Sequence, residues 1–358
     1  MTEPTPPSVL TAGYVPLDIV VFGKRMWRAA GGTAGNVAAI LSFLGWRAGV
    51  IADLGDDAAG REVVRDLRKA TVDTRRIRLR PTGITPRVVH EITAGGHRFV
   101  FRCPRCGTRF PHSRPLPVDR ADELVGAKAA SDVFFFDRLN HGTVRLAEHF
   151  AAAGSLVVFE PARIGQQHLL DRALDAAHIV KYAADRVPDP ASIPAKAGRQ
   201  VHVVTRGDSG ASYRIGTGTW HHSAAFPYPT VDTGGAGDWT TAGLIHALGA
   251  RKRTVAAVGD ALRWAQALAA VSCGAPGARG LAKQQSAEAV LRAAHFLENS
   301  RGIAPPASAT THAQRAKVAD GLCDWCLLPI AADGVAPTAI AAPASPTTTR
   351  GPLAGQRG

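Results

Sequence analysis

Aromatic residues and long apolar runs are scarce in this sequence of 358 residues. Phe, Trp and Tyr make up 6% of it, so we expect a largely aliphatic core. No run of about 18 uncharged apolar residues occurs, which argues against a membrane-spanning helix. Residues 1–8 lack the charged start and apolar stretch of a signal peptide, so we expect a cytoplasmic protein.

Acidic residues are the minority among the charged ones. There are 42 Lys and Arg against 29 Asp and Glu, which gives a net charge of +13. Such an excess can draw a protein to nucleic acid or anionic lipid, serve an anionic small substrate, or belong to a solvated surface. The basic residues are scattered, with a modest density over residues 75–114, so we favour the solvated surface and expect no membrane partner.

Short apolar strands alternate with helical patterns of about ten residues. Strands are expected at 9–22 (broken at Gly13), 47–52, 132–137, 155–160, 179–182 and 201–205, and helices at 31–44, 58–70, 143–153, 168–177, 239–248 and 254–272. This alternation predicts an α/β fold with a doubly wound, mostly parallel sheet that is covered on both faces. Residues 86–101 alternate apolar and polar around Gly95-Gly96, which is typical of a β hairpin.

A glycine-rich loop, Asp-Thr-Gly-Gly-Ala-Gly-Asp at residues 232–238, leads directly into one of these helices. Small residues let the backbone approach a ligand, and amides at a helix N-terminus favour an anion. The carboxylate of Asp238 suits a base that takes a proton from an attacking hydroxyl while the amides stabilise charge on a phosphoryl group. Taken alone, the loop fits a tight strand-to-helix turn capped by Asp238 equally well.

Four segments, in this order, resemble the ribokinase-like, or PfkB, carbohydrate kinases over roughly residues 9–295. They are Gly13 with Asp18 (opening strand), Gly31-Gly32, Asn36, Ala38, Leu44-Gly45, Gly55-Asp56-Asp57 and Gly60 (first signature), residues 203–211 (nucleotide-side strand and turn) and residues 232–238 (second signature). The resemblance implies a ribokinase-like fold whose small β lid is the hairpin region, about residues 84–115.

The resemblance also implies an activity: an ATP-dependent kinase that uses Mg²⁺ and transfers the γ-phosphate to a hydroxyl of a sugar or nucleoside. Asp238 would be the general base. Gly235, Ala236 and Gly237 would form the anion hole.

Substrate and nucleotide contacts follow from the same resemblance. Asp18, Gly32 and Asn36 would hold substrate hydroxyls, while Thr205 and Gly207 would lie against the nucleotide. The residues by themselves also allow a helix cap for Asn36 and a turn residue for Asp18.

Two departures from the family pattern concern the catalytic centre. Thr240 stands where a phenylalanine is common, and the family's Asn-x-x-Glu element appears only as Tyr-Ala-Ala-Asp at residues 182–185. Asp185 could act on magnesium through water, or it could pair with an arginine or cap a helix. These departures keep open the alternative of a binding or regulatory protein that retains the kinase fold.

Four of the five cysteines form two Cys-x-x-Cys pairs, Cys103 with Cys106 and Cys323 with Cys326. Without an export signal, this spacing points to a metal or redox site. We favour one closed, structural Zn²⁺ site that staples the C-terminal segment to the lid. A disulfide pair, a redox switch or free thiols remain alternatives. Cys273 is expected to be a small core residue.

Composition divides the chain into a kinase domain, residues 1–300, and a C-terminal extension, residues 301–358, that contains the second cysteine pair. Residues 327–358 are typical of a disordered tail.

A homodimer formed through the lid is one possibility that the sequence leaves undecided. Arginines and phenylalanines alternate around the first pair, which could bind nucleic acid, but an amphipathic hairpin explains the pattern better. Which sugar or nucleoside is used, and whether it is already phosphorylated, does not follow.

Overall fold

A nine-stranded sheet forms the centre of the computed structural model, which describes residues 5–93, 96–187, 192–196, 198–249, 253–299 and 322–328. The strand order is β13-β12-β11-β10-β9-β8-β1-β4-β5. The bounds are β1 Ser8–Ala12, β4 Arg47–Gly55, β5 Ile77–Arg80, β8 Val133–Phe136, β9 Leu156–Phe159, β10 Ile179–Ala183, β11 Val201–Thr205, β12 Ala211–Ile215 and β13 His221–Ser223. Neighbours from β11 to β5 run parallel, and only the β11–β12 and β12–β13 pairs are antiparallel. The predicted doubly wound, mostly parallel sheet is confirmed.

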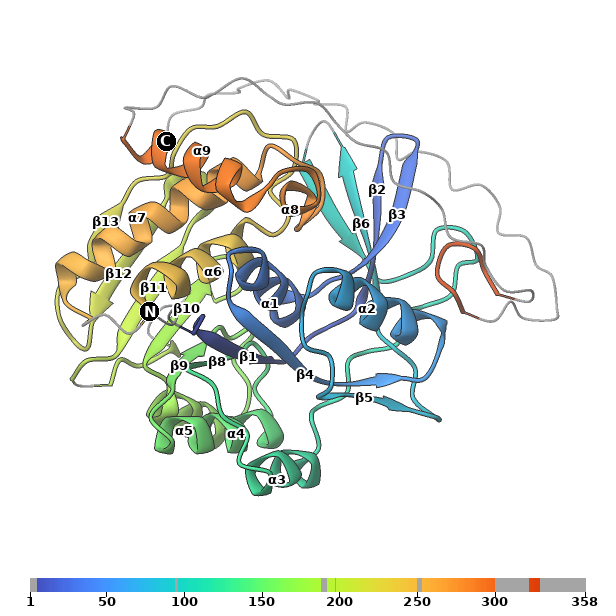
Figure 1. Cartoon of the computed structure of the whole chain (residues 1–358), viewed down its shortest axis with the longest axis horizontal. Coiled ribbons are helices and arrows are strands. Elements are labelled where there is room, and N and C mark those ends of the chain that lie inside the picture. The colour runs from blue at the N-terminus through green and yellow to red at the C-terminus, as the bar shows by residue number, and fades with distance from the viewer. Residues whose placement is uncertain are drawn as a thin grey trace, which may run out of the picture.

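Helices cover both faces of this sheet (Figure 1). One layer contains α1 Thr33–Phe43, α2 Ala58–Lys69, α6 Ala236–Leu248, α7 Val255–Ser272, α8 Gly280–Gln284 and α9 Ala287–Asn299. The other contains α3 Val118–Gly126, α4 His141–Ala152 and α5 Gln167–Ala176. The first layer packs a mainly aliphatic core, as expected. The second is richer in aromatic rings than expected, because Phe134 stacks on Phe150, and Phe136 on Phe159, with ring centroids 4.4 and 4.5 Å apart.

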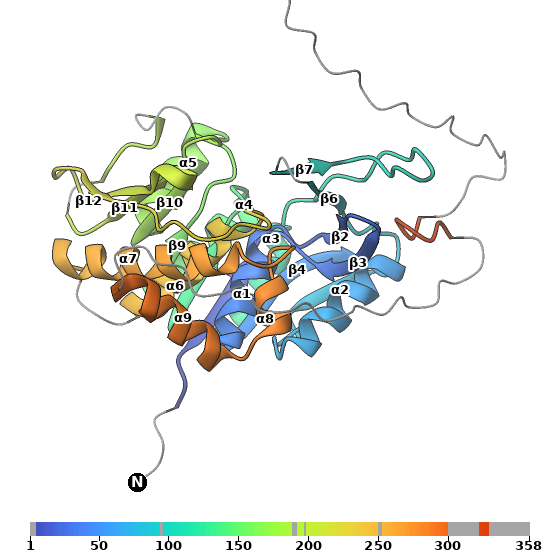
Figure 2. The same ribbon diagram turned by 90° about the horizontal axis from the view of Figure 1, so that it is seen from above.

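A second, four-stranded sheet with the order β3-β2-β6-β7 is the lid, and it stands to one side of the large sheet (Figure 2). Its strands are β2 Leu17–Phe22, β3 Arg25–Ala30, β6 Arg87–Thr93 and β7 Gly96–Val100. The predicted hairpin supplies only β6 and β7. The sequence analysis missed β3, because Arg-Met-Trp-Arg-Ala-Ala does not alternate cleanly between apolar and polar residues.

Two further differences from the sequence analysis affect the functional regions. Helix α6 begins at Ala236, three residues earlier than expected, so Asp238 lies in its first turn. Leu327 and Leu328, which were predicted to belong to the tail, are buried, and the rest of that tail, 329–358, lies outside the described residues.

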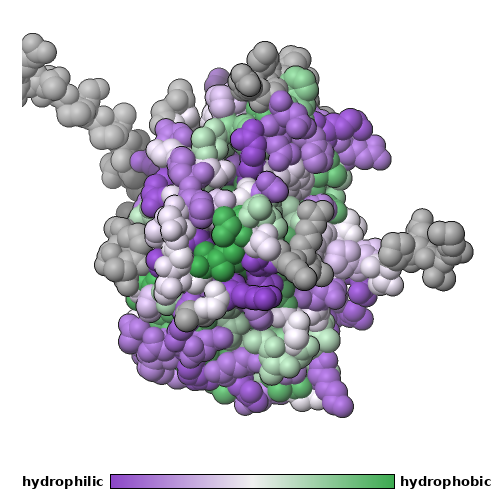
Figure 3. Space-filling view, turned by 90° about the vertical axis from the view of Figure 1, so that its left-hand side faces the viewer, coloured by the Kyte–Doolittle hydropathy of each residue, from purple (hydrophilic) through white to green (hydrophobic). Residues whose placement is uncertain are grey.

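None of the described helices is long and apolar enough to cross a membrane. At the end of the molecule that carries β12 and β13, apolar side chains form only small groups among hydrophilic ones (Figure 3).

Candidate active site

The glycine-rich loop reaches helix α6 through a left-handed turn. Gly235, the N-cap, has φ 90°, and a Cβ at this position would lie 2.5 Å from the Cα of Ala278. The Asp232 carboxylate shapes the loop by accepting from the amides of Gly234 and Gly277, both at 2.8 Å. The first-turn amides of α6, including those of Gly237 and Asp238, have no partner within their own helix, which makes this turn suited to an anion.

Asp238 is joined to helix α1 by a single hydrogen bond. Asn36 Nδ2 donates to Asp238 Oδ2 at 2.7 Å, so the structure brings together two residues that lie 202 positions apart in the chain. Burial raises the pKa of the Asp238 carboxyl and the nearby charge of Glu160 raises it further, while Asn36, Lys181 and Arg186 oppose the rise. A carboxylate with a raised pKa, held by an oriented donor, has the character of a general base.

A buried ion pair under the first turn of α6 was missed by the sequence analysis. Lys181 Nζ lies 2.7 Å from Glu160 Oε1 and donates to the carbonyl of Gly237 at 2.9 Å. Thr241 Oγ1 donates to the other oxygen of Glu160 at 2.6 Å. The available signal was a lysine inside the apolar strand β10 and a glutamate directly after β9. The pair fixes the first turn of α6 against the edge of the large sheet.

A small open cleft of about 20 Å³ lies between the lid strands β2 and β3 and residues 277–283, which include most of α8. Asp18 from the lid and Asn36 from α1 both line it, and each has a side-chain Oδ1 that is buried without a hydrogen-bond partner among the described residues. Burial raises the pKa of Asp18 to about 7, against the opposing charges of His90 and Arg279. Two buried acceptors without donors are suited to the hydroxyl groups of a ligand.

Glycines keep this cleft open. A Cβ on Gly31 would lie 1.9 Å from the carboxylate of Asp18, so no other residue fits there without displacing it. Gly32, the N-cap of α1, has φ 72°, and a Cβ would lie 2.1 Å from the Tyr14 carbonyl oxygen. Gly32 therefore contributes its backbone conformation, which directs α1 and Asn36 toward the cleft.

Two lid histidines, also missed by the sequence analysis, meet the glycine-rich loop. His90 Nε2 and His97 Nδ1 each lie 3.4 Å from Asp232 Oδ1, and His97 Nδ1 is 3.1 Å from the hydroxyl of Thr233. Desolvation lowers the pKa of His97. The imidazoles link the inner face of the lid to the glycine-rich loop.

The expected nucleotide residues lie along the carboxyl edge of the large sheet. Thr205 ends β11, and its carbonyl accepts from the Ala184 amide at 2.9 Å. Gly207, with φ 57°, opens a short 3₁₀ turn, Gly207–Ser209. Asp185 is exposed in the turn after β10, and among the described residues no hydrogen bond joins it to the glycine-rich loop.

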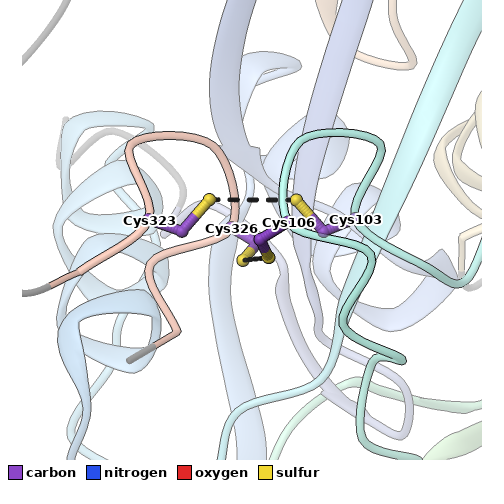
Figure 4. Close-up of side chains that lie close together, drawn as sticks. All are labelled: Cys103, Cys106, Cys323 and Cys326. Carbon is purple, nitrogen blue, oxygen red and sulfur yellow. Dashed lines mark hydrogen bonds between the residues drawn. The ribbon is translucent and has the colours of Figure 1, made fainter. Parts of the chain in front are cut away.

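The four paired cysteines converge beside the lid (Figure 4). Their sulfur atoms all lie within 4.8 Å of one another. We call the two Cys-x-x-Cys turns, residues 103–107 and 323–327, knuckles. Between them, the sulfur of Cys103 lies 3.9 Å from that of Cys323, and the sulfur of Cys106 lies 3.7 Å from that of Cys326. Cys273, by contrast, is buried at the end of α7, as expected of a core residue.

Comparison with known proteins gives a consistent result. Residues 14–285 match the pfkB family of carbohydrate kinases. The chain is 29% identical to the fructokinase of Klebsiella pneumoniae over 74% of this chain and 93% of that protein. It is also 29% identical to the ATP-dependent ribose-1-phosphate kinase of Halopiger xanaduensis over 76% of this chain and 93% of that one. A Vibrio cholerae fructokinase structure with fructose, ADP and calcium aligns with a TM-score of 0.62 at 20% identity, over 81% of this chain and 99% of that one. The chain belongs to the pfkB family of carbohydrate kinases.

Proposed function

We propose that this protein is an ATP-dependent kinase that phosphorylates a hydroxyl group of a sugar or nucleoside. The observation that carries the proposal is the Asn36–Asp238 hydrogen bond, because it fixes a carboxylate with a raised pKa between the cleft and the anion-binding turn. Phosphoryl transfer needs positioning, charge neutralisation and a base, and this arrangement supplies all three within one turn of helix.

The acceptor binds in the cleft between the lid and α1. Its hydroxyls donate to the two buried acceptors, Asp18 Oδ1 and Asn36 Oδ1, that lack protein donors. The reacting hydroxyl lies at Asp238, which removes its proton as the oxygen attacks the γ-phosphorus. The amides of residues 235–237 hold the charge on the transferred group, and the lid excludes water from it.

The nucleotide binds along the carboxyl edge of the large sheet, against Thr205 and Gly207. Magnesium would neutralise charge on its phosphates. Asp185 fits a water-mediated contact with that ion, because its carboxylate is exposed at this edge, whereas both oxygens of Glu160 are held by Lys181 and Thr241. A solved relative from Vibrio cholerae contains fructose, ADP and calcium, and another, from Pyrococcus horikoshii, contains ATP.

A coupled assay of ADP release tests the proposal across sugars, sugar phosphates and nucleosides, each with Mg²⁺-ATP. We expect an acceptor-dependent rate with at least one member of the panel. Nucleotide binding without turnover on any acceptor would instead support the second candidate, a binding or regulatory protein. Two observations favour this candidate. The charge of Arg186 lowers the pKa of Asp238, and the neighbouring Asp185 is exposed at the position where the family has a glutamate that organises the metal.

We further propose that the four paired cysteines hold one structural Zn²⁺ ion. Four sulfurs at about 2.3 Å from a tetrahedral zinc lie about 3.8 Å from one another, close to the observed 3.7 and 3.9 Å. The two knuckles repeat the same backbone pattern. The amides of Cys103 and Cys323 both donate, at 2.9 Å, to the carbonyl five residues later, and the residues after the second cysteines, Gly107 and Leu327, have φ 71° and 59°.

Metal analysis of protein purified without chelator tests this site. We expect about one zinc per chain in the native protein and none in the variant with Cys323→Ser and Cys326→Ser. Cys273→Ser is the matched control, because this thiol lies outside the cluster, and it should retain the ion. Native protein without zinc would contradict the proposal, and two disulfides found by mass spectrometry would support the alternative.

Residues 1–300 would form the kinase unit, with residues 301–358 as the extension that carries the second knuckle. We propose a cytoplasmic location for the protein, where thiols stay reduced and able to bind zinc.

A further inference from the structure

The lid sheet has an apolar outer face that points away from the cleft. Ile19 from β2 and Val89 from β6 are fully buried on this face. Helix α2 packs against β2 and β3, but no α2 residue belongs to the apolar cluster of Ile19 and Val89. These two residues pack in one cluster with the two cysteine knuckles. The other members are Cys103, Phe110, Cys323, Cys326 and Leu328, with half-buried Val21, Met26, Val100, Cys106 and Trp325 at its margin.

The inner face of the same two strands forms the substrate side. Asp18 precedes Ile19 in β2, and His90 follows Val89 in β6, so side chains alternate between the cleft and the cysteine cluster. Asp18 and Val20 line the cleft, and His90 contacts the glycine-rich loop. Any shift of the sheet relative to the knuckles would therefore also move Asp18 and His90.

Arg87 connects the C-terminal knuckle to the base of the lid and to the kinase body. This arginine, the first residue of β6, is only 1% exposed. Its Nε donates to the carbonyl of Cys326 at 2.5 Å, and its guanidinium also donates to the Thr85 carbonyl and to Asp57 at 2.9 Å. Asp57 in turn caps helix α2 through the amide of Gly60. One buried cation thus holds the knuckle, the start of β6 and a helix of the body in fixed relation.

A second arginine makes a similar tie from β3. Arg28 donates to the carbonyl of Asp324 at 2.8 Å and pairs with Glu62 of α2 at 3.3 Å. In both contacts the arginine donates to a backbone carbonyl of the C-terminal knuckle, so the contacts depend on the conformation of that knuckle rather than on its side chains.

We propose that residues 322–328 cover the outer face of the lid sheet, and that this contact positions Asp18 and His90 to bind the sugar or nucleoside substrate. The proposal rests on the proposed kinase function for its effect on the acceptor. The occupant is this chain's own segment, because the segment buries Ile19 and Val89 and supplies carbonyls to Arg28 and Arg87. A second copy of the protein cannot use the same face while the knuckle occupies it.

Steady-state kinetics of the full-length Cys323→Ser, Cys326→Ser variant test the positioning role. With the acceptor identified by the screen, we expect KM for the acceptor to rise about tenfold or more. KM for ATP should change less than about twofold, because Thr205 ends β11 of the large sheet and Gly207 lies in the turn that follows it. Cys273→Ser should match the native protein in both constants. An unchanged acceptor KM in a folded variant that has lost its zinc would overturn the proposal.

Hydrogen exchange of the native protein, with and without a zinc chelator, tests the cover independently of turnover. We expect the amides of β2 and β6 to exchange at least tenfold faster after chelation, while those of β8 to β11 keep their protection. Equal protection in both conditions would overturn the proposal, even if no acceptor were found. So would a native dimer whose β2 and β6 amides lose protection on dilution, because a second copy would then be the cover.

Discussion

Replacing Asp18 by asparagine should stabilise the unliganded protein, while the loss of the carboxylate should weaken binding of the sugar or nucleoside substrate. Asp18 is only 8% exposed, and burial raises its pKa from 3.8 to about 7. A raised carboxyl pKa means that the fold disfavours the charged form. The difference of about 3 pKa units, at about 1.36 kcal/mol each, corresponds to about 4 kcal/mol at high pH. Asparagine keeps the shape of the side chain without this cost.

The gain should depend on pH in a defined direction. Below pH 3.8 the carboxyl is protonated in both folded and unfolded chains, so the two proteins should be equally stable. Between pH 3.8 and about 7 the unfolded chain loses the proton first, so native stability falls as the pH rises, by about 2 kcal/mol at pH 5. Above about pH 7 the difference should level off near its maximum.

Thermal unfolding at pH 4, 5, 6, 7 and 8.5 measures this dependence. At about 1.5–2 °C per kcal/mol for a chain of this length, Asp18→Asn should melt about 6–8 °C higher than the native protein at pH 8.5, and at nearly the same temperature at pH 4. Asp66→Asn is the control of opposite sign, because Arg279 and Lys283 lower the pKa of Asp66 to about 2, so it should lose stability above pH 4. A gain for Asp18→Asn that does not vary with pH would refute the reasoning.

Three further predictions concern the catalytic centre. Asn36→Ala removes a donor that lowers the pKa of Asp238, so the acid limb of the pH profile of kcat/KM should move to higher pH, and kcat/KM at pH 7 should fall about tenfold or more. An acid limb that stays at the native pH would contradict this role of Asn36. Gly235→Ala places a Cβ 2.5 Å from Ala278 at φ 90°. Denaturant unfolding should therefore show a free energy of unfolding lower by about 1–3 kcal/mol, and kcat should fall. A fully active variant of native stability would show that the left-handed turn is not required. Lys181→Met leaves a buried carboxylate without its partner and should cost about 3–5 kcal/mol in urea unfolding, whereas a neutral effect would show that the charge is dispensable.

Local patterns predicted most of the large sheet and its helices, because parallel strands buried on both faces appear as apolar runs, such as Val133–Phe136. The lid was only half predicted. Residues 25–30 contain two arginines, and they form β3 only through pairing with β2 and packing on α2. Residues that are distant in sequence stabilise β3, and the local propensity of residues 25–30 carries no information about them.

In the candidate site too, local motifs were predictable from the sequence, whereas contacts between distant residues were not. The glycine-rich loop and the candidate base, Asp238, could be identified from motifs, because glycine and aspartate stand at the positions that the proposed chemistry requires. Glu160, Lys181, His90 and His97 could not, because each is a single polar residue whose role comes from tertiary neighbours. Asp185 stays a prediction: the structure leaves it exposed, and Arg186 acts on Asp238 from the same turn.

Asp238→Asn tests the central claim most directly. Asparagine can still pair with Asn36, but it cannot accept the proton of an attacking hydroxyl. Single-turnover transfer from labelled ATP to the best acceptor should fall by about a thousandfold or more, while the dissociation constant for ATP, measured by calorimetry, stays within about threefold. Transfer at the native rate with intact ATP binding would contradict the account, because another group would then be the base.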